Sequence, residues 1–167
     1  MTLAQLNALP RDEAERELSR CCGSSGWSSA MAGRRPFRDE QHLYQAAEET
    51  WWALSSPDWL EAFSHHPRIG ERAAGWARDE QASASGASQK IKDELVKWNN
   101  EYERRFGHVF LISAMGKQAD EMLQQMERRM NNEPAAELRV AAGEQAKITR
   151  LRLEKLLSVP SEPARVG

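Results

Sequence analysis

Residues 88–107 read SQKIKDELVKWNNEYERRFG, and this stretch carries the strongest structural signal in the chain. Its apolar residues are separated by four, three, four and four positions, which places on one helical face Ile91, Leu95, Trp98, Tyr102 and Phe106. Ser88 is typical of a residue that caps the start of a helix, and Gly107 is typical of the residue just past its end. The stretch therefore predicts one long amphipathic helix whose apolar side packs against a core.

Helical patterns continue on both sides of this stretch. Prolines, glycines and capping residues delimit further helices over residues 3–9, 12–21, 41–52, 56–66, 77–84, 117–131 and 134–158. We expect a flexible break over residues 23–26, followed by a short helical turn up to Gly33. Residues 108–113 form the only β-like segment, and one isolated run cannot make a sheet. We therefore predict an all-α fold: a single-domain multi-helix bundle with short loops over residues 1–158, followed by a flexible tail over residues 159–167.

Composition narrows the class of protein. The 167 residues include 23 Lys and Arg against 25 Asp and Glu, a net charge of −2, which disfavours a nucleic-acid or membrane-surface binder. No apolar stretch is long enough to span a membrane, and the N-terminus does not resemble a secretory signal. Cys21 and Cys22 are adjacent, so they form neither a disulfide framework nor a spaced metal site. We expect a cytoplasmic protein without a metal.

His66 is the first candidate for chemistry, because it stands at the expected end of a helix, directly before Pro67. A histidine there can donate or accept a proton near neutral pH. Histidine at a helix C-terminus also interacts favourably with the helix dipole, which explains the residue without any catalytic role. Glu80 and Gln81 follow in a glycine-bearing loop, where a carboxylate could orient a histidine but could equally be a solvated surface group. The residue types alone leave both interpretations open.

Two further groups of residues have the same ambiguity. An apolar segment follows Gly107 and comprises Phe110, Leu111, Ile112, Ser113 and Ala114. Core packing explains this segment, whereas a functional version would offer unbonded backbone amides to a polar ligand. Arg152, on the last helix, is by default a solvated basic residue.

Four sequence blocks together are more specific than any of these residues. They are FSHHPRIG at 63–70, the Glu80-Gln81 pair, WNNEYERRFGHVFLI at 98–112 and ELRVAAGEQAKITRLR at 137–152. In this order they resemble the 2-oxo-4-hydroxy-4-carboxy-5-ureidoimidazoline (OHCU) decarboxylase family, and the match runs from about residue 3 to residue 157. The resemblance implies an all-helical, cofactor-independent carboxy-lyase that forms (S)-allantoin in urate breakdown.

The resemblance also assigns roles to individual residues. It implies that His66 is the catalytic proton donor and that Pro67 begins a compact active-site loop. Glu80 matches a second catalytic residue, Gln81 a substrate contact, and Arg152 a candidate partner of the substrate or of Glu80. The backbone of residues 110–114 is expected to bind the ureido-imidazoline ring. Ala77 stands where the family often has serine, so one hydroxyl contact is in question.

Chemistry supports this assignment, although two alternatives stay open. Electrons left by departing CO₂ can delocalise into the ring, so the reaction needs no metal or pyridoxal as electron sink. Donors aimed at the developing charge contribute about 3–4 kcal/mol each, and a general acid contributes on the order of 10²–10⁴-fold. The first alternative is a non-catalytic helical protein-interaction module. The second, a hydrolase acting on 5-hydroxyisourate, is disfavoured because that family is β-rich.

We expect a small-molecule substrate and no nucleic-acid or membrane partner. A homodimer that covers apolar residues such as Trp51 and Trp52 is one alternative for the oligomeric state.

Overall fold

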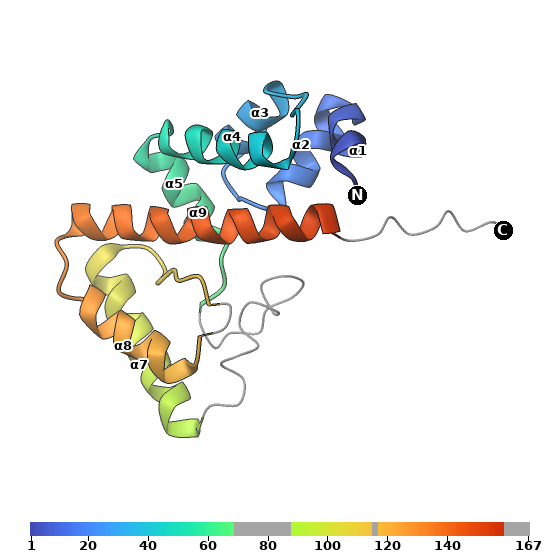
Figure 1. Ribbon diagram of the computed structural model, residues 1–167. Helices are drawn as coiled ribbons and strands as arrows, with labels where there is room; N and C mark the ends of the chain where they lie inside the picture. Colours follow the sequence, from blue (N-terminus) through green and yellow to red (C-terminus); the bar gives the residue numbers. More distant parts are fainter. Residues whose placement is uncertain (69–87, 115–116, 159–167) are drawn as a thin grey trace. The chain divides into compact units, whose positions relative to one another are not determined.

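The structure is a computed structural model that describes residues 1–68, 88–114 and 117–158. These residues contain eight helices and no strand (Figure 1): α1 Leu3–Ala8, α2 Arg11–Ser19, α3 Ser25–Gly33, α4 Glu40–Trp52, α5 Ser56–Ser64, α7 Gln89–Phe106, α8 Ala119–Arg129 and α9 Pro134–Ser158. The predicted all-α fold is confirmed. The helix expected over residues 77–84 and the tail over 159–167 lie outside the described residues.

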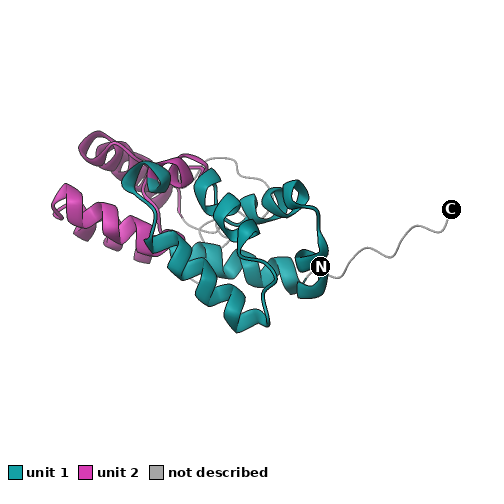
Figure 2. Cartoon of the chain, turned by 90° about the horizontal axis from the view of Figure 1, so that it is seen from above, with its two compact units in different colours: residues 1–59, 146–167 teal, residues 60–145 magenta. Residues whose placement is uncertain are grey.

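Residue contacts divide the chain into two compact units (Figure 2). Unit 1 comprises residues 1–59 and 146–167, and unit 2 comprises residues 60–145. Helix α9 therefore contributes its first part to unit 2 and the remainder to unit 1. The expectation of a single domain over residues 1–158 stays a prediction.

Unit 1 packs α1 to α4 and the beginning of α5 around a tryptophan-rich core. Trp27 is fully buried, and its indole Nε1 donates to the Ala47 carbonyl at 3.3 Å. Trp59 is also buried, and its Nε1 donates to the Trp51 carbonyl at 3.0 Å. Both indole N–H groups therefore find an acceptor in the core, as large amphipathic rings require.

The expected break over residues 23–26 is wrong, because α3 already begins at Ser25. Ser24 caps this helix by accepting a hydrogen bond from the Trp27 amide at 3.2 Å. Gly26 lies inside the first turn, where a Cβ would come within 3.1 Å of Asp58 Oδ1. The glycine therefore permits close approach between α3 and α5 instead of interrupting the chain.

Unit 2 contains the helix that the opening stretch predicts. Helix α7 is capped by Ser88 and ends at Gly107, which has a left-handed φ of 79°. Its apolar face packs on α8 in a cluster that includes Leu95, Tyr102, Met122 and Met126. The expected inward apolar face of this helix is confirmed.

Several helix boundaries differ from the predicted ones. Helix α5 begins at Ser56 as predicted, with the Ser55 carbonyl accepting from the Trp59 amide, but it ends at Ser64, two residues early. Helix α8 is shorter than expected, from Ala119 to Arg129, and residues 108–113 do not form a strand. Among the described residues, no helix is long and apolar enough to cross a membrane.

Candidate functional site

His66 is held by a tight turn at the end of α5. The helix ends at Ser64, earlier than predicted, and the His66 amide donates to the Phe63 carbonyl at 3.1 Å. The following Pro67 disfavours helical backbone at His66, so the chain leaves the helix here. His66 and Pro67 are both half-buried. The turn thus presents an imidazole that is partly shielded from water.

The imidazole of His66 has a partner on α9. Its Nε2 lies 2.6 Å from Oε1 of Gln145, and the Gln145 side chain is fully buried. An amide oxygen can only accept, so this contact places a hydrogen on His66 Nε2. Gln145 thereby fixes the orientation of the ring. It is a residue to which the sequence assigned no role, although it stands in the last of the four quoted blocks.

An aromatic cluster links the end of α5 with the segment that follows α7. The His108 ring lies 5.3 Å from that of Phe63 and 5.5 Å from that of Tyr102, measured between centroids. The Tyr102 ring in turn lies 5.2 Å from that of Phe110 in an edge-to-face arrangement. These contacts join the turn before His66 to the beginning of residues 110–114.

Residues 110–114 are buried and irregular, and cationic side chains hold two of their carbonyl groups. Arg129 Nη1 donates to the Leu111 carbonyl at 2.7 Å, and Lys117 Nζ donates to the Ser113 carbonyl at 2.6 Å. Within the described part of the chain, the backbone N–H groups of Leu111, Ile112 and Ser113 donate to no acceptor. Buried amides are nearly always paired. The segment therefore offers hydrogen-bond donors to a polar ligand.

A buried polar network supports this segment from behind. Glu137, fully buried on α9, accepts from Arg129 Nε at 2.7 Å and from Asn132 Nδ2 at 2.9 Å. Tyr102 also donates its hydroxyl hydrogen to Glu137. Burial, and then this hydrogen bond, raise the pKa of Tyr102 far above its ordinary value. The phenol therefore remains a neutral donor at physiological pH.

Sequence reasoning missed this network, although one signal was present. Glu137 precedes Ala141 and Ile148 at helical spacing, and both of these residues are buried. A carboxylate on the buried face of a helix requires a partner. The partner, Arg129, is one of two adjacent arginines at the end of α8, and the sequence does not distinguish it from Arg128.

The remaining predicted residues are not brought together by the described part of the chain. Glu80, Gln81 and Ala77 lie outside the described residues. Arg152 belongs to unit 1, where its positive charge acts on the buried thiol of Cys21. Arg68, next to Pro67, donates through Nε to both carboxylate oxygens of Glu103 on α7, at 2.8 and 3.0 Å. This ion pair anchors the beginning of the expected active-site loop.

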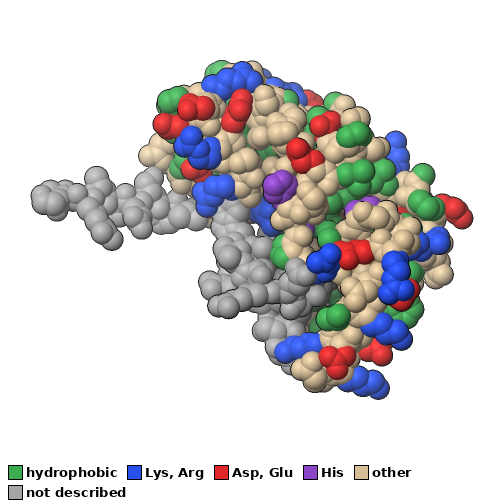
Figure 3. All heavy atoms as spheres, turned by 180° about the vertical axis from the view of Figure 1, so that it is seen from behind, with side chains coloured by type: hydrophobic (Ala, Val, Ile, Leu, Met, Phe, Trp, Pro, Cys, Tyr) green, Lys and Arg blue, Asp and Glu red, His purple; other side chains and the backbone are tan. Residues whose placement is uncertain are grey.

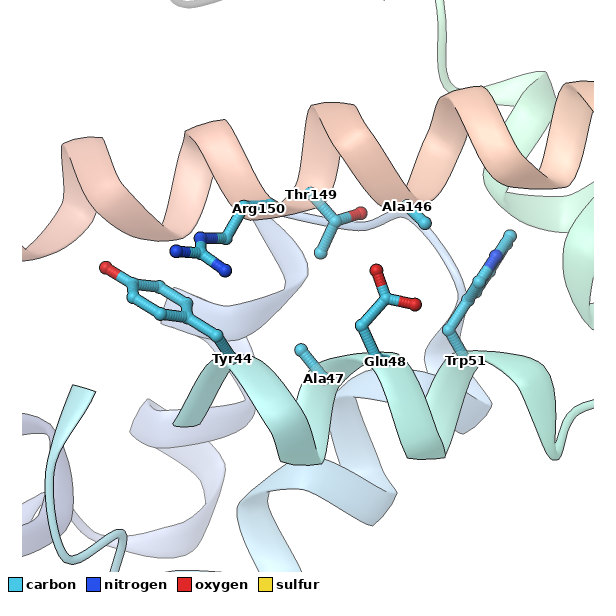
Figure 4. A pocket seen from close by; sticks show the side chains of 7 residues that line it. All are labelled: Tyr44, Ala47, Glu48, Trp51, Ala146, Thr149 and Arg150. Atoms are coloured by element: carbon cyan, nitrogen blue, oxygen red, sulfur yellow. The ribbon is translucent and has the colours of Figure 1, made fainter. Parts of the chain in front are cut away.

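A cavity in unit 1 does not contain any of the predicted residues. It lies between α4 and α9, is lined by Tyr44, Glu48, Thr149 and Arg150 among others, and encloses about 20 Å³, space for one water molecule (Figure 4). The Arg150 guanidinium covers the Tyr44 ring at 3.7 Å from its centroid. The cavity is too small for a ureido-imidazoline.

The charged side chains suggest no other class of site. On the face shown in Figure 3, acidic and basic side chains of the described residues are interspersed. Among the described residues, no group of three or more His, Cys, Asp or Glu could hold a metal ion.

Comparisons with known proteins agree on one family. The family model described as OHCU decarboxylase matches residues 7–154. A uric acid degradation bifunctional protein of Arabidopsis thaliana is 39% identical over 153 residues, covering 86% of this chain and 47% of that protein. The OHCU decarboxylase of Haloferax volcanii is 28% identical over 163 residues, 95% of this chain and 97% of that protein.

A solved structure gives the same result. The crystal structure of an OHCU decarboxylase in the presence of (S)-allantoin has a TM-score of 0.79 and 39% sequence identity, and the match covers 86% of this chain and 98% of that one. The chain spans about half of the Arabidopsis bifunctional protein and 32% of a second bifunctional relative, from Bacillus sp..

Proposed function

Because this chain belongs to the OHCU decarboxylase family, we propose that it converts OHCU to (S)-allantoin in urate breakdown, without an organic cofactor or metal. The family resemblance read from the four sequence blocks is thereby confirmed. The observation that carries the proposal at the site is the half-buried His66, oriented by Gln145 in the same unit as the unbonded amides of residues 111–113.

The conversion of OHCU to allantoin releases CO₂ and takes up one proton. The bond between the quaternary ring carbon and its carboxylate breaks, CO₂ leaves, and the electron pair delocalises into the ring. A proton then adds to one face of the neighbouring ring carbon, which bears the ureido group, while the hydroxyl group on the carbon that lost CO₂ becomes a carbonyl and passes its proton to the ring nitrogen. The product is allantoin. The protein must hold the carboxylate out of the ring plane, stabilise the delocalised charge and deliver the proton.

We assign the proton delivery to His66. A positioned general acid contributes on the order of 10²–10⁴-fold to such a step. The hydrogen bond to Gln145 uses Nε2 and holds the ring in one orientation, so the proton that His66 delivers comes from its other nitrogen, Nδ1. Glu80 would keep the imidazole protonated and crowd the substrate carboxylate, which favours its departure as neutral CO₂. Glu80→Gln is then expected to lower turnover much more than binding, and equal losses in both would count against this role.

The backbone amides provide the second contribution. The N–H groups of residues 111–113 are donors on a buried segment in which cationic side chains already engage the Leu111 and Ser113 carbonyl groups. Donors fixed before the reaction stabilise developing negative charge by about 3–4 kcal/mol each. Gln81, Pro67 and Arg152 complete the substrate contacts that we propose.

The test uses freshly generated substrate. OHCU is produced in the cuvette from urate by urate oxidase and hydroxyisourate hydrolase, and the circular dichroism of the product is followed. Wild type is expected to form optically active allantoin rapidly, His66→Ala to lose this activity, and the exposed neighbour variant His65→Ala to retain it. Activity in His66→Ala would remove the assigned proton donor. A wild type no faster than buffer would overturn the decarboxylase and favour the interaction module.

We further propose a cytoplasmic location and leave the homodimer as a prediction. Cys21 and Cys22 are buried and are not in a disulfide, which suits a reducing compartment. Trp52 is 40% exposed, and a second copy of the chain could cover it. Light scattering at several concentrations distinguishes a dimer from a monomer.

A further inference from the structure

The peptide unit between Leu111 and Ile112 has one engaged and one unengaged polar group. The Leu111 carbonyl accepts from Arg129 Nη1 at 2.7 Å. This peptide bond is trans, so the Ile112 N–H points opposite to that carbonyl. Ile112 is only 6% exposed, and its N–H donates to no acceptor in the described chain. A group that holds the Leu111 carbonyl in place therefore also determines the direction of the buried, unbonded Ile112 N–H.

Arg129 is itself held rigidly. Its Nε and Nη2 lie 2.7 and 2.6 Å from the same Glu137 oxygen, and the guanidinium carbon lies 4.4 Å from the centroid of the Phe110 ring. The Arg129 and Glu137 side chains are only 8% and 0% exposed. The planar guanidinium thus has one face on an aromatic ring and its edge on a carboxylate. The remaining nitrogen, Nη1, can therefore donate to the Leu111 carbonyl in only one orientation.

Stability alone gives little reason for such an ion pair. Two charges lose their hydration when they are buried, and apolar residues of similar volume are often equally stable or more stable. A cation at a carbonyl oxygen, in contrast, polarises the peptide and makes its N–H a stronger donor. Lys117 does the same at the Ser113 carbonyl, two residues further along the segment. Both cations therefore act on carbonyl groups of the segment that contains the unbonded amides of residues 111–113.

We propose that Arg129, held by Glu137, is a positioning residue that aims the Ile112 N–H at the substrate oxygen that gains negative charge as CO₂ leaves. This inference rests on the proposed function, because it assigns that oxygen to OHCU. Arg129 does not touch the substrate in this proposal. It acts through the planar Leu111–Ile112 peptide.

The test is the double variant Arg129→Met/Glu137→Gln. It removes both charges together, leaves an amide that can still accept from Tyr102, and leaves the Leu111 carbonyl without its cation. Arg128→Met is the matched control, because Arg128 is the exposed neighbour on α8. Three measurements are made on each protein: kcat/KM with OHCU, the Kd and stoichiometry of (S)-allantoin by calorimetry, and the ¹⁵N shift of the Ile112 amide.

We expect kcat/KM to fall about 10²-fold in the double variant, as for a misplaced group at a reacting centre. The Kd of (S)-allantoin rises about tenfold with unchanged stoichiometry, and the Ile112 ¹⁵N resonance shifts because its peptide has lost the hydrogen bond at the carbonyl. Arg128→Met leaves all three measurements unchanged. Arg129→Lys, which retains a cation, recovers part of the activity.

A purely structural role predicts something different. A partly unfolded variant would bind fewer equivalents of allantoin at an unchanged Kd. That result, or a native kcat/KM in the double variant, would overturn the inference and leave the decarboxylase proposal intact. If wild type neither turned over OHCU nor bound allantoin, both the proposed function and the inference that rests on it would be wrong.

Discussion

Nε2 of His66 and Oε1 of Gln145 lie 2.6 Å apart, although 79 positions separate the two residues in the sequence. The contact connects the turn after α5 with the middle of α9, and Gln145 is fully buried. A buried amide that accepts from an imidazole restricts the rotation of the ring and keeps a hydrogen on Nε2. The proton donor that we propose is therefore oriented by a residue with no charge of its own.

Gln145→Leu tests this orientation. Leucine keeps the approximate volume but cannot accept from His66, so we expect kcat/KM with OHCU to fall about tenfold, the equivalent of one hydrogen bond of about 1.4 kcal/mol. The ¹⁵N shift of His66 Nε2 should change, because its N–H has lost the acceptor at position 145. Gln124→Leu, at an exposed position of α8, is the control and should retain full activity. Unchanged kinetics in Gln145→Leu would show that the contact does not orient the catalytic group.

Two glycines should respond in opposite directions to alanine. Gly107 has a φ of 79°, and a Cβ there would meet nothing within 4 Å, so Gly107→Ala is opposed only by the left-handed backbone, by about 1–2 kcal/mol. Gly143 lies inside α9, also with nothing within 4 Å of a Cβ, so Gly143→Ala should stabilise by up to about 1 kcal/mol. Urea unfolding measures both changes. A stabilised Gly107→Ala protein would mean that α7 does not end in this conformation.

Cys21 should be an unreactive thiol. Burial, opposed by the nearby Arg152, raises the pKa of Cys21 from 9.0 to about 12. In a Cys22→Ala background, a disulfide reagent at pH 8 should modify native Cys21 at least ~10³-fold more slowly than in urea, because the thiolate fraction falls tenfold per pKa unit. Native and unfolded protein reacting at similar rates would contradict the buried position.

The helices that the sequence predicted best are those whose signals are local. Ser88, Gly107 and the apolar row between them determine α7 within one stretch of chain, and the structure agrees at both ends. The error at residues 23–26 has a tertiary cause, because Gly26 serves the contact with Asp58 more than thirty positions away. A glycine that permits close approach and a glycine that breaks a helix look the same in a single sequence.

In the site, too, the sequence predicted the residues that have local signals and missed those that depend on tertiary contacts. His66 was found from its neighbours Pro67 and His65, and the segment after Gly107 from its composition. Gln145 and Arg129 were not predicted, because each contacts a residue from a different part of the chain. A single sequence does not show which residues of two separate elements will pair. Glu137, a carboxylate in an apolar row, was the one visible sign of the network.

The same network should limit stability at alkaline pH. Burial, and then the hydrogen bond to Glu137, raise the pKa of Tyr102 above its ordinary value of 10.0. The folded protein therefore retains the phenol proton at a pH where the unfolded chain releases it. Stability from this group is complete below pH 10 and is lost as the pH rises above it, because the native state then binds more protons than the unfolded state.

Tyr102→Phe separates this contribution from others, including that of Cys21. At pH 10.5 the Tyr102 phenol of the unfolded chain is mostly ionised, which lowers the free energy of unfolding of the wild type by about 0.8 kcal/mol. Tyr102→Phe has no phenol at this position and does not lose this amount. The free energy of unfolding in urea, measured at pH 8 and pH 10.5, should therefore fall more for wild type than for Tyr102→Phe by this amount. Absorbance at 295 nm should show Tyr102 unionised in the folded protein at the higher pH. Equal losses in both proteins would mean that the hydroxyl is accessible to solvent, and the buried acceptor on Glu137 would then need another donor.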